Sequence, residues 1–323
     1  MEERNFSEKL IQRFCKDCNV PINIFIYPYF YSRLKLYDPI YHTIDKYNLF
    51  IKSMKSYDNE QDYFEDYNRV KDEAINAIKS SQGYKDFNEL DLSKFIVHDD
   101  YAHLPGKDIY HPSNAKKSFL SIDMKHANFS VLKYYTYDIF NSDTWEDFMK
   151  RFTDNEHIIQ SKYIRQVILG NCNPGRHITY EKFVMSHLMH KLYLYCLNHG
   201  VNLPFDKIVA FHNDELIYDI GDFTIPEALN AMAVIESFEN EIPISCTTFT
   251  LFDLAGYGYA KSMHDGQIKL KGMENEFVPM ILRRIFREEI QPDDMVFMFK
   301  GETARFDKVP EKIKNGQFPK IRR

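Results

Sequence analysis

The chain has 323 residues, 44% hydrophobic and 27% charged, a composition typical of a globular protein with a large buried core. Its formal net charge of −6 gives no global basic signature, which counts against a general nucleic-acid coat protein. Five cysteines are too few for a disulfide scaffold and indicate reduced thiols.

The N-terminal stretch, 1–96, is predicted to be a mostly helical module. Apolar residues at helical spacing predict helices over 6–19, 44–56 and 60–79, and the apolar run 22–27 predicts a short strand. The chain starts without an apolar signal region, and no run approaches the roughly 18 apolar residues of a membrane span. We therefore expect a cytoplasmic protein without membrane contact.

The next stretch, 97–112, is predicted to be a loop because it is interrupted by proline and glycine. It carries five side chains of types that bind metal ions: His98, Asp99, Asp100, His103 and His111. Such a cluster can bind a metal. Because no regular element fixes the spacing of these residues, we favour a polar loop beside an active site.

The central part of the chain presents acidic side chains at the ends of two predicted strands. A strand over 119–122 leads to Asp123, followed by a helix over 127–135. The stretch 208–220 predicts a hairpin whose tight turn holds Asp214 and Glu215. Mg²⁺ prefers hard oxygen ligands of this kind beside substrate phosphates. Aspartate is also a common turn residue, and that simpler interpretation stays open.

Between these acids lies a predicted basic helical face. The motif Thr153-x-x-Glu156 predicts a capping box that opens a helix to residue 169. On that helix Lys162, Arg165 and Gln166 fall three and four positions apart and share one face. They can neutralise a triphosphate or simply face solvent. A longer helix is predicted over 179–197.

The rest of the chain predicts further helices over 225–238 and 277–289, with strands over 244–251, 257–261 and 267–271. The tail from residue 312 is basic.

Three segments resemble polymerase motifs. The D-M-K-H-A-N-F-S-V of residues 123–131 resembles motif A of reverse transcriptases and related palm-domain polymerases. The H-N-D-E-L of 212–216 looks like their motif C and is also similar to the His-Asp-Glu motif C of family A DNA polymerases. Between them, the Q-V-I-L-G-N-C-N-P of 166–174 is loosely similar to reverse-transcriptase motif B. The order A, B, C is that of the family, and the resemblance covers about half the chain, 118–272.

The resemblance implies roles for residues around the acids. Asn128, five positions after Asp123, occupies the place of the bulky ring that lies under the sugar in reverse transcriptases. A smaller polar residue there permits a ribose 2′-hydroxyl, so the choice between dNTP and NTP stays open. Independently of the resemblance, the rigid polar Asn-Pro turn with Arg176 beside it is a candidate contact to a nucleotide base or to the template strand.

At other positions the chain departs from the polymerase motifs or matches them. Glu215 replaces the second aspartate of motif C, and a histidine and an asparagine replace the aromatic residue and its neighbour. Lys261 stands where a motif D lysine is expected. Lys269 and Lys271 stand where a primer-grip hairpin contacts the nucleic-acid backbone.

The sequence therefore predicts an α/β (α+β) protein with a palm-like antiparallel sheet backed by helices. The expected organisation is a helical N-terminal module (1–96), a catalytic core (97–261) and a basic nucleic-acid-gripping module (262–323). The predicted activity is nucleotidyl transfer to a 3′-hydroxyl, with a primer/template or a single strand as the nucleic-acid partner. Asp123, Asp214 and Glu215 would hold two Mg²⁺ or Mn²⁺ ions, while Lys162, Arg165, Gln166, Asn128 and Arg176 contact the nucleoside triphosphate.

Two other functions fit the same sequence. A metal-dependent nuclease would use the same carboxylates together with His98, Asp99 and Asp100. A non-catalytic binding or scaffold protein would carry a degenerate palm and use its aromatic surfaces to meet a partner.

Overall fold

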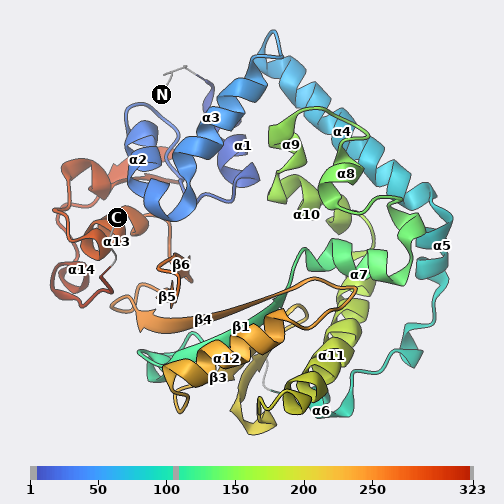
Figure 1. Ribbon diagram of the computed structural model, residues 1–323. Coiled ribbons are helices and arrows are strands. Elements are labelled where there is room, and N and C mark those ends of the chain that lie inside the picture. The colour runs from blue at the N-terminus through green and yellow to red at the C-terminus, as the bar shows by residue number, and fades with distance from the viewer. Residues whose placement is uncertain (1–5, 105–108, 321–323) are drawn as a thin grey trace. The chain divides into compact units, whose positions relative to one another are not determined.

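A computed structural model describes residues 6–104 and 109–320 of the chain (Figure 1). The chain divides into two compact units, each built from separate stretches. Unit 1 comprises Met1–Lys71, Phe152–Val167 and Phe252–Arg323, and unit 2 comprises Asp72–Arg151 and Ile168–Leu251. Unit 1 therefore combines residues from all three stretches expected from the sequence, and unit 2 combines residues from the first two.

Unit 1 is mainly helical, with two hairpins near the C-terminus. Its elements are α1 (Glu8–Asp17), α2 (Tyr29–Tyr41), α3 (Thr43–Met54), α9 (Glu156–Ile159), β5 (Tyr259–Met263), β6 (Ile268–Lys271), α13 (Val278–Phe286), η5 (Pro292–Met295), β7 (Val296–Phe299), β8 (Glu302–Arg305) and α14 (Glu311–Asn315). The helices α4 (Glu60–Ser80) and α10 (Lys162–Gly170) each pass from one unit into the other.

Aromatic rings fill the core of unit 1. Phe14, Tyr47 and Phe50 are fully buried, and the Phe14 ring centroid lies 5.3 Å from that of Tyr47 and 5.2 Å from that of Phe50. Such ring pairs contribute about 0.5–1.5 kcal/mol each beyond the area that they bury. Aromatic residues make up 15% of the chain, and many of them are buried in this way.

A buried arginine fastens the N-terminal helices of unit 1 to its C-terminal part. Arg33 in α2 donates to Asp294 Oδ1 at 3.3 Å and to the backbone oxygen of Val296 at 3.1 Å. Arg283 in α13 donates from Nε to Asp294 Oδ2 at 2.9 Å. These bonds compensate for the burial of the Asp294 carboxylate, which is only 1% exposed.

Two predictions for unit 1 are wrong. Residues 22–27 form no strand: Ile22 and Ile24 alternate inward and are buried without strand pairing. The helix predicted from Thr153 is two helices, α9 and α10. Asn155, not Thr153, caps α9, and the Ser161 hydroxyl accepts from the Ile164 backbone N–H to start α10. The hydrogen bonds from the backbone to the Asn155 and Ser161 side chains start two separate helices in place of one continuous helix.

Among the described residues, unit 2 holds four of the strands and the longest helix. Its elements are α5 (Gln82–Glu89), η1 (Leu92–Lys94), α6 (Asp99–Ala102), η2 (Pro112–Asn114), β1 (Ser118–Met124), α7 (Ala127–Tyr135), η3 (Tyr137–Ile139), α8 (Trp145–Met149), α11 (Pro174–Asn198), η4 (Phe205–Lys207), β2 (Ile208–Phe211), β3 (Glu215–Asp219), α12 (Ile225–Glu236) and β4 (Ile244–Asp253), whose last two residues belong to unit 1. The helix predicted over 127–135 and the hairpin predicted over 208–220 are confirmed.

The predicted loop 97–112 is more ordered than expected. It contains the short helix α6 and the start of η2, while residues 105–108 lie outside the described part of the chain. His98 and Asp100 are thus placed by a helix rather than by an irregular loop.

The sheet of unit 2 is antiparallel, with the strand order β2-β3-β1-β4 (Figure 1). Along the chain of unit 2 run β1, helices including α11, then β2, β3, α12 and β4, which is the β-α-β-β-α-β connectivity. This order places β1 beside the hairpin β2–β3. In unit 1, β5 and β6 pair as an antiparallel hairpin. The predicted α+β class with an antiparallel sheet is confirmed.

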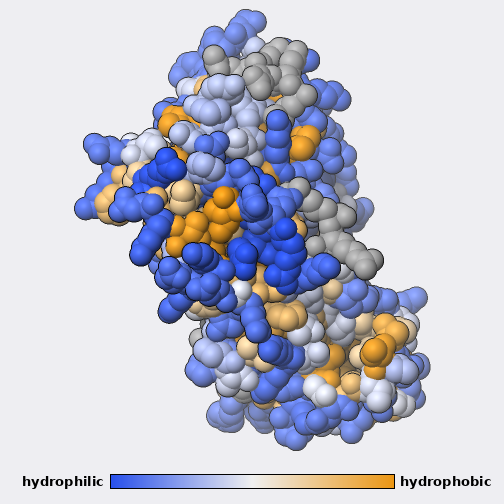
Figure 2. All heavy atoms as spheres, turned by 90° about the vertical axis from the view of Figure 1, so that its left-hand side faces the viewer, coloured by the Kyte–Doolittle hydropathy of each residue, from blue (hydrophilic) through white to orange (hydrophobic). Residues whose placement is uncertain are grey.

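The described residues contain no helix long and apolar enough to cross a membrane. On the face drawn in Figure 2, hydrophobic residues gather in small patches surrounded by hydrophilic ones. Such scattered patches are ordinary for a protein surface.

Candidate functional site

Strand β1 brings Asp123 to the end of an otherwise buried strand. Phe119, Ser121 and Asp123 alternate onto one face of β1. Phe119 is buried against Phe249 of β4, with ring centroids 5.4 Å apart, whereas Asp123 is half-buried. The face therefore changes from apolar to acidic along the strand.

The hairpin β2–β3 brings two more carboxylates to the same end. Asp123 is the direct cross-strand partner of Glu215, the first residue of β3. The backbone N–H of Met124 donates to the backbone oxygen of Asp214 at 2.8 Å, which fixes the hairpin turn beside the end of β1. The three acids singled out from the sequence, Asp123, Asp214 and Glu215, are thus brought together by antiparallel pairing.

The Glu215 side chain is oriented by a serine. The hydroxyl of Ser121 donates to Glu215 Oε1 at 2.6 Å. Because Ser121 lies two residues before Asp123, this bond directs one oxygen of Glu215 back along β1. Glu215 is thereby held in one orientation beside Asp123.

Helix α11 adds a fourth carboxyl group, Glu181. Its side chain is buried, only 5% exposed. Burial, together with the negative charges of Asp214 and Asp123, raises the pKa of Glu181 to about 8. A carboxyl group that is buried next to two others is mostly protonated at neutral pH, and strongly perturbed acids of this kind gather at functional sites.

These four residues, Asp123, Glu181, Asp214 and Glu215, are named here the acidic group, and they supply only oxygen ligands. Such hard ligands suit Mg²⁺ or Mn²⁺ better than softer ions. Repulsion between neighbouring carboxylates is relieved when a cation lies among them. No three members of the acidic group, however, bring ligand atoms within 4.8 Å of one another. Among the described residues, one set alone places three ligand atoms within 4.8 Å of one another, and it is His98, Asp100 and His190.

Two predicted nucleotide contacts also lie in unit 2. Asn128 is exposed in the first turn of α7, five residues after Asp123. Arg176 instead donates through Nη2 to the backbone oxygens of Phe87, at 2.9 Å, and Leu90, at the C-terminal end of α5. These bonds give Arg176 a structural role, because the carbonyl groups at the end of a helix have no hydrogen-bond partner within the helix.

The predicted basic face belongs to unit 1. Lys162 and Gln166 are exposed on α10 and, with Lys16 of α1, line a cavity of about 560 Å³. Four further amide side chains and no acidic side chain are among its lining residues, so the cavity is polar and basic. Arg165 is half-buried and does not line it.

The predicted strand-gripping lysines differ in exposure. Lys269 and Lys271 are exposed on β6, where a nucleic-acid backbone can reach them. Lys261 on β5 is only 5% exposed, and this burial counts against the predicted contact.

Sequence reasoning missed Glu181 although a signal was present. The helix predicted over 179–197 has an apolar stripe that includes Val184 and Leu188, three and seven positions after Glu181. A carboxylate on an apolar stripe is costly to bury and therefore indicates a special role.

No protein family, curated protein or solved structure matches this chain significantly.

Proposed function

We propose that the protein is a divalent-cation-dependent nucleotidyltransferase of the palm-polymerase type. The observation that carries this proposal is the convergence of Asp123, Asp214 and Glu181 at one end of β1, from a strand, a hairpin turn and a helix. Carboxyl groups gathered in this way repel one another and lower the stability of the fold unless a cation is bound. Asp123 and Asp214 also belong to the two segments that resemble polymerase motifs A and C.

Each residue has a distinct part in the proposal. Asp123 and Asp214 hold the cation, and Glu181 completes the oxygen ligands once it has lost its proton. Ser121 positions Glu215 through the 2.6 Å hydrogen bond. Mg²⁺ bound there would favour attack by a 3′-hydroxyl on an α-phosphate and stabilise the pyrophosphate that leaves.

The substrates of the proposed reaction are nucleoside triphosphates and a nucleic-acid strand. Asn128 is exposed five residues after Asp123 and is the residue that would face the sugar. Its small polar side chain leaves room for a 2′-hydroxyl.

The test is a primer-extension assay with dNTPs or NTPs, in Mg²⁺ or Mn²⁺, on the wild type and on Asp123→Asn and Asp214→Asn. We expect nucleotide incorporation by the wild type and a loss of at least about 100-fold in either variant, the size of loss that removal of one electrostatic contact to the reacting groups causes. The matched control is Asp219→Asn, at the other end of β3, where Asp219 pairs with Lys117 at 3.9 Å.

The control should incorporate nucleotide at the wild-type rate. Equal activity in the wild type, Asp123→Asn and Asp214→Asn would contradict the assignment. Strand cleavage without added nucleotide would support the nuclease alternative. If the wild type shows neither incorporation nor cleavage under these conditions, the remaining candidate is the non-catalytic binding function.

A further inference from the structure

A second group of ligating side chains lies on another part of α11. His190 is on α11, and His98 and Asp100 flank the start of α6. The two segments are docked together by other contacts. The His98 backbone N–H donates to Ser186 Oγ of α11 at 3.0 Å, and the His98 ring meets the ring of His187 edge-on, with centroids 5.7 Å apart.

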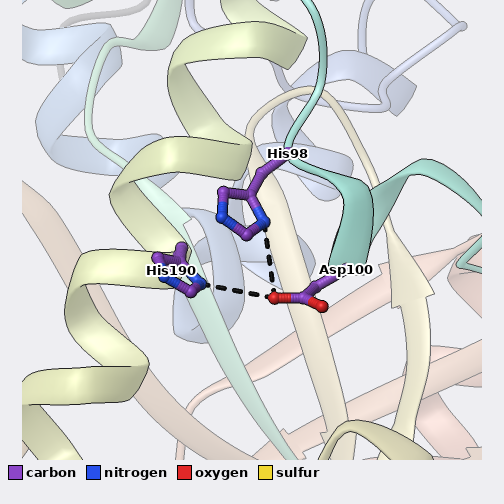
Figure 3. A group of neighbouring side chains, drawn as sticks. All are labelled: His98, Asp100 and His190. Carbon is purple, nitrogen blue, oxygen red and sulfur yellow. Dashed lines mark ion pairs between the residues drawn. The ribbon is translucent and has the colours of Figure 1, made fainter.

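His98 and His190 direct a ring nitrogen at the same oxygen of Asp100 (Figure 3). His98 Nδ1 and His190 Nδ1 each lie 3.4 Å from the same oxygen, Asp100 Oδ2. The three ligand atoms all lie within 4.8 Å of one another. Both imidazole nitrogens are buried and accept or donate no hydrogen bond.

These separations fit a metal coordination shell. With ligands about 2.0–2.1 Å from a tetrahedral zinc ion, neighbouring ligand atoms lie about 3.3 Å apart. The two observed nitrogen-to-oxygen separations of 3.4 Å are close to that edge length.

An ordinary ion pair explains the arrangement less well. The two imidazole rings are stacked with centroids 3.9 Å apart, so protonating both would place two positive charges side by side. Neither nitrogen makes a hydrogen bond to the carboxylate, although each lies close to it. A cation between the three groups uses all three sets of lone pairs at once.

The group is separate from the acidic group. His190 lies nine positions after Glu181 on α11. At about 1.5 Å and 100° per residue, nine positions correspond to roughly 13 Å along the axis and to the opposite side of the helix. The ligand chemistry also differs, because imidazole nitrogen suits zinc and other transition ions rather than Mg²⁺.

We propose that His98, Asp100 and His190 form a mononuclear site for Zn²⁺ that fastens the 98–102 segment to α11. Three protein ligands leave one coordination position for water. The site links a short helix with few backbone bonds of its own to the longest helix of the unit. Zinc would therefore order this segment.

The test measures zinc and cobalt binding by the full chain, purified without a polyhistidine tag and stripped with a chelator. We expect one equivalent of Zn²⁺ per chain by elemental analysis and a visible absorption band from four-coordinate Co²⁺. His98→Ala, His190→Ala and Asp100→Asn should each weaken binding by more than the roughly 10–100-fold that loss of an outer-shell partner costs.

Two controls make the result specific. His199→Ala removes a histidine from the end of α11, where its Nδ1 lies 2.8 Å from the Tyr195 backbone oxygen, and it should bind zinc as the wild type does. The double variant Asp123→Asn, Asp214→Asn should also keep the zinc. Asp100→Asn keeps the size and shape of the side chain at an exposed position, so the circular dichroism spectrum of this variant should match that of the wild type.

A wild-type chain that binds no Zn²⁺ would overturn the proposal. Undiminished binding by His98→Ala, His190→Ala and Asp100→Asn would do the same. Loss of zinc in the double acidic variant, with retention in His190→Ala, would assign the bound zinc to the acidic group and also overturn it.

Discussion

Replacing Glu181 by glutamine removes the buried carboxyl group whose pKa is raised to about 8. The raised pKa means that the folded chain binds this proton more tightly than the unfolded chain does. Stability contributed by the protonated acid is therefore present at low pH and is lost as the pH rises from the usual value of 4.5 through about 8. Glutamine does not titrate, so Glu181→Gln should escape that loss.

The size of the effect follows from the two pKa values. At 1.36 kcal/mol per pKa unit, the cost of Glu181 is below about 1 kcal/mol at pH 5 and between about 4 and 5 kcal/mol at pH 9. The stability of Glu181→Gln relative to the wild type should thus rise by about 4 kcal/mol between these pH values. Any constant cost of burying the amide cancels from this difference.

The single tryptophan of the chain provides the assay. Trp145 is buried in unit 2, the unit that contains Glu181, with its ring centroid 5.5 Å from that of Phe148. Urea unfolding followed by tryptophan fluorescence at pH 5, 7 and 9 gives the free energy of unfolding for both chains. Repeating the series in Mg²⁺ should stabilise the wild type most at pH 9 and the variant much less.

Two results would refute this reasoning. A free-energy difference that does not change with pH would mean that Glu181 has no raised pKa. Equal stabilisation of both chains by Mg²⁺ would mean that Glu181 is not among the ligands of the cation. The first result concerns burial and charge, and the second concerns metal binding, so the two steps are tested separately.

Three further substitutions test the fold. Asp294→Ala leaves the buried Arg33 charge without its carboxylate and should cost about 3–5 kcal/mol by urea unfolding followed by circular dichroism. Arg176→Ala should cost about 1–3 kcal/mol in the tryptophan-monitored assay because two carbonyl groups lose their donor, and Arg176→Lys should restore only part of it. Gly258→Ala should cost about 1–3 kcal/mol in thermal unfolding, since the position has φ of 142° and an added Cβ would lie 2.7 Å from the Lys271 backbone oxygen. Wild-type stability in any of these variants would contradict the contact concerned.

The sequence predicts most of unit 2 near the acidic group, because its signals there are local. A short, mostly apolar run that ends at Asp123 specifies β1, and a short polar turn between two apolar runs specifies the hairpin that holds Asp214. These two features bring Asp123 beside Glu215 once the strands pair. Their positions therefore follow from the apolar runs and from turn chemistry.

The contributions of α11 could not be derived in the same way. Glu181 and His190 meet partners that are distant in sequence, and a helix pattern alone does not say which neighbour covers each face. Arg176 shows the converse: its charge suggests a ligand contact, but its guanidinium is used by backbone carbonyl groups of α5. Long-range packing decides the role of each of these residues.

The stability cost of Glu181 supports a functional acidic group independently of any motif. A buried carboxyl group that loses its proton near neutral pH lowers the stability of a fold, and a glutamine of almost the same shape avoids that cost. The arrangement becomes favourable when a cation replaces the proton, because Asp123 and Asp214 then attract the same ion that Glu181 binds. Cation binding at neutral pH should accordingly release up to one proton per chain, which calorimetry in buffers of different ionisation enthalpy measures directly. Proton release by the wild type together with none by Glu181→Gln would connect the raised pKa to the proposed site, whereas equal release by both chains would separate them.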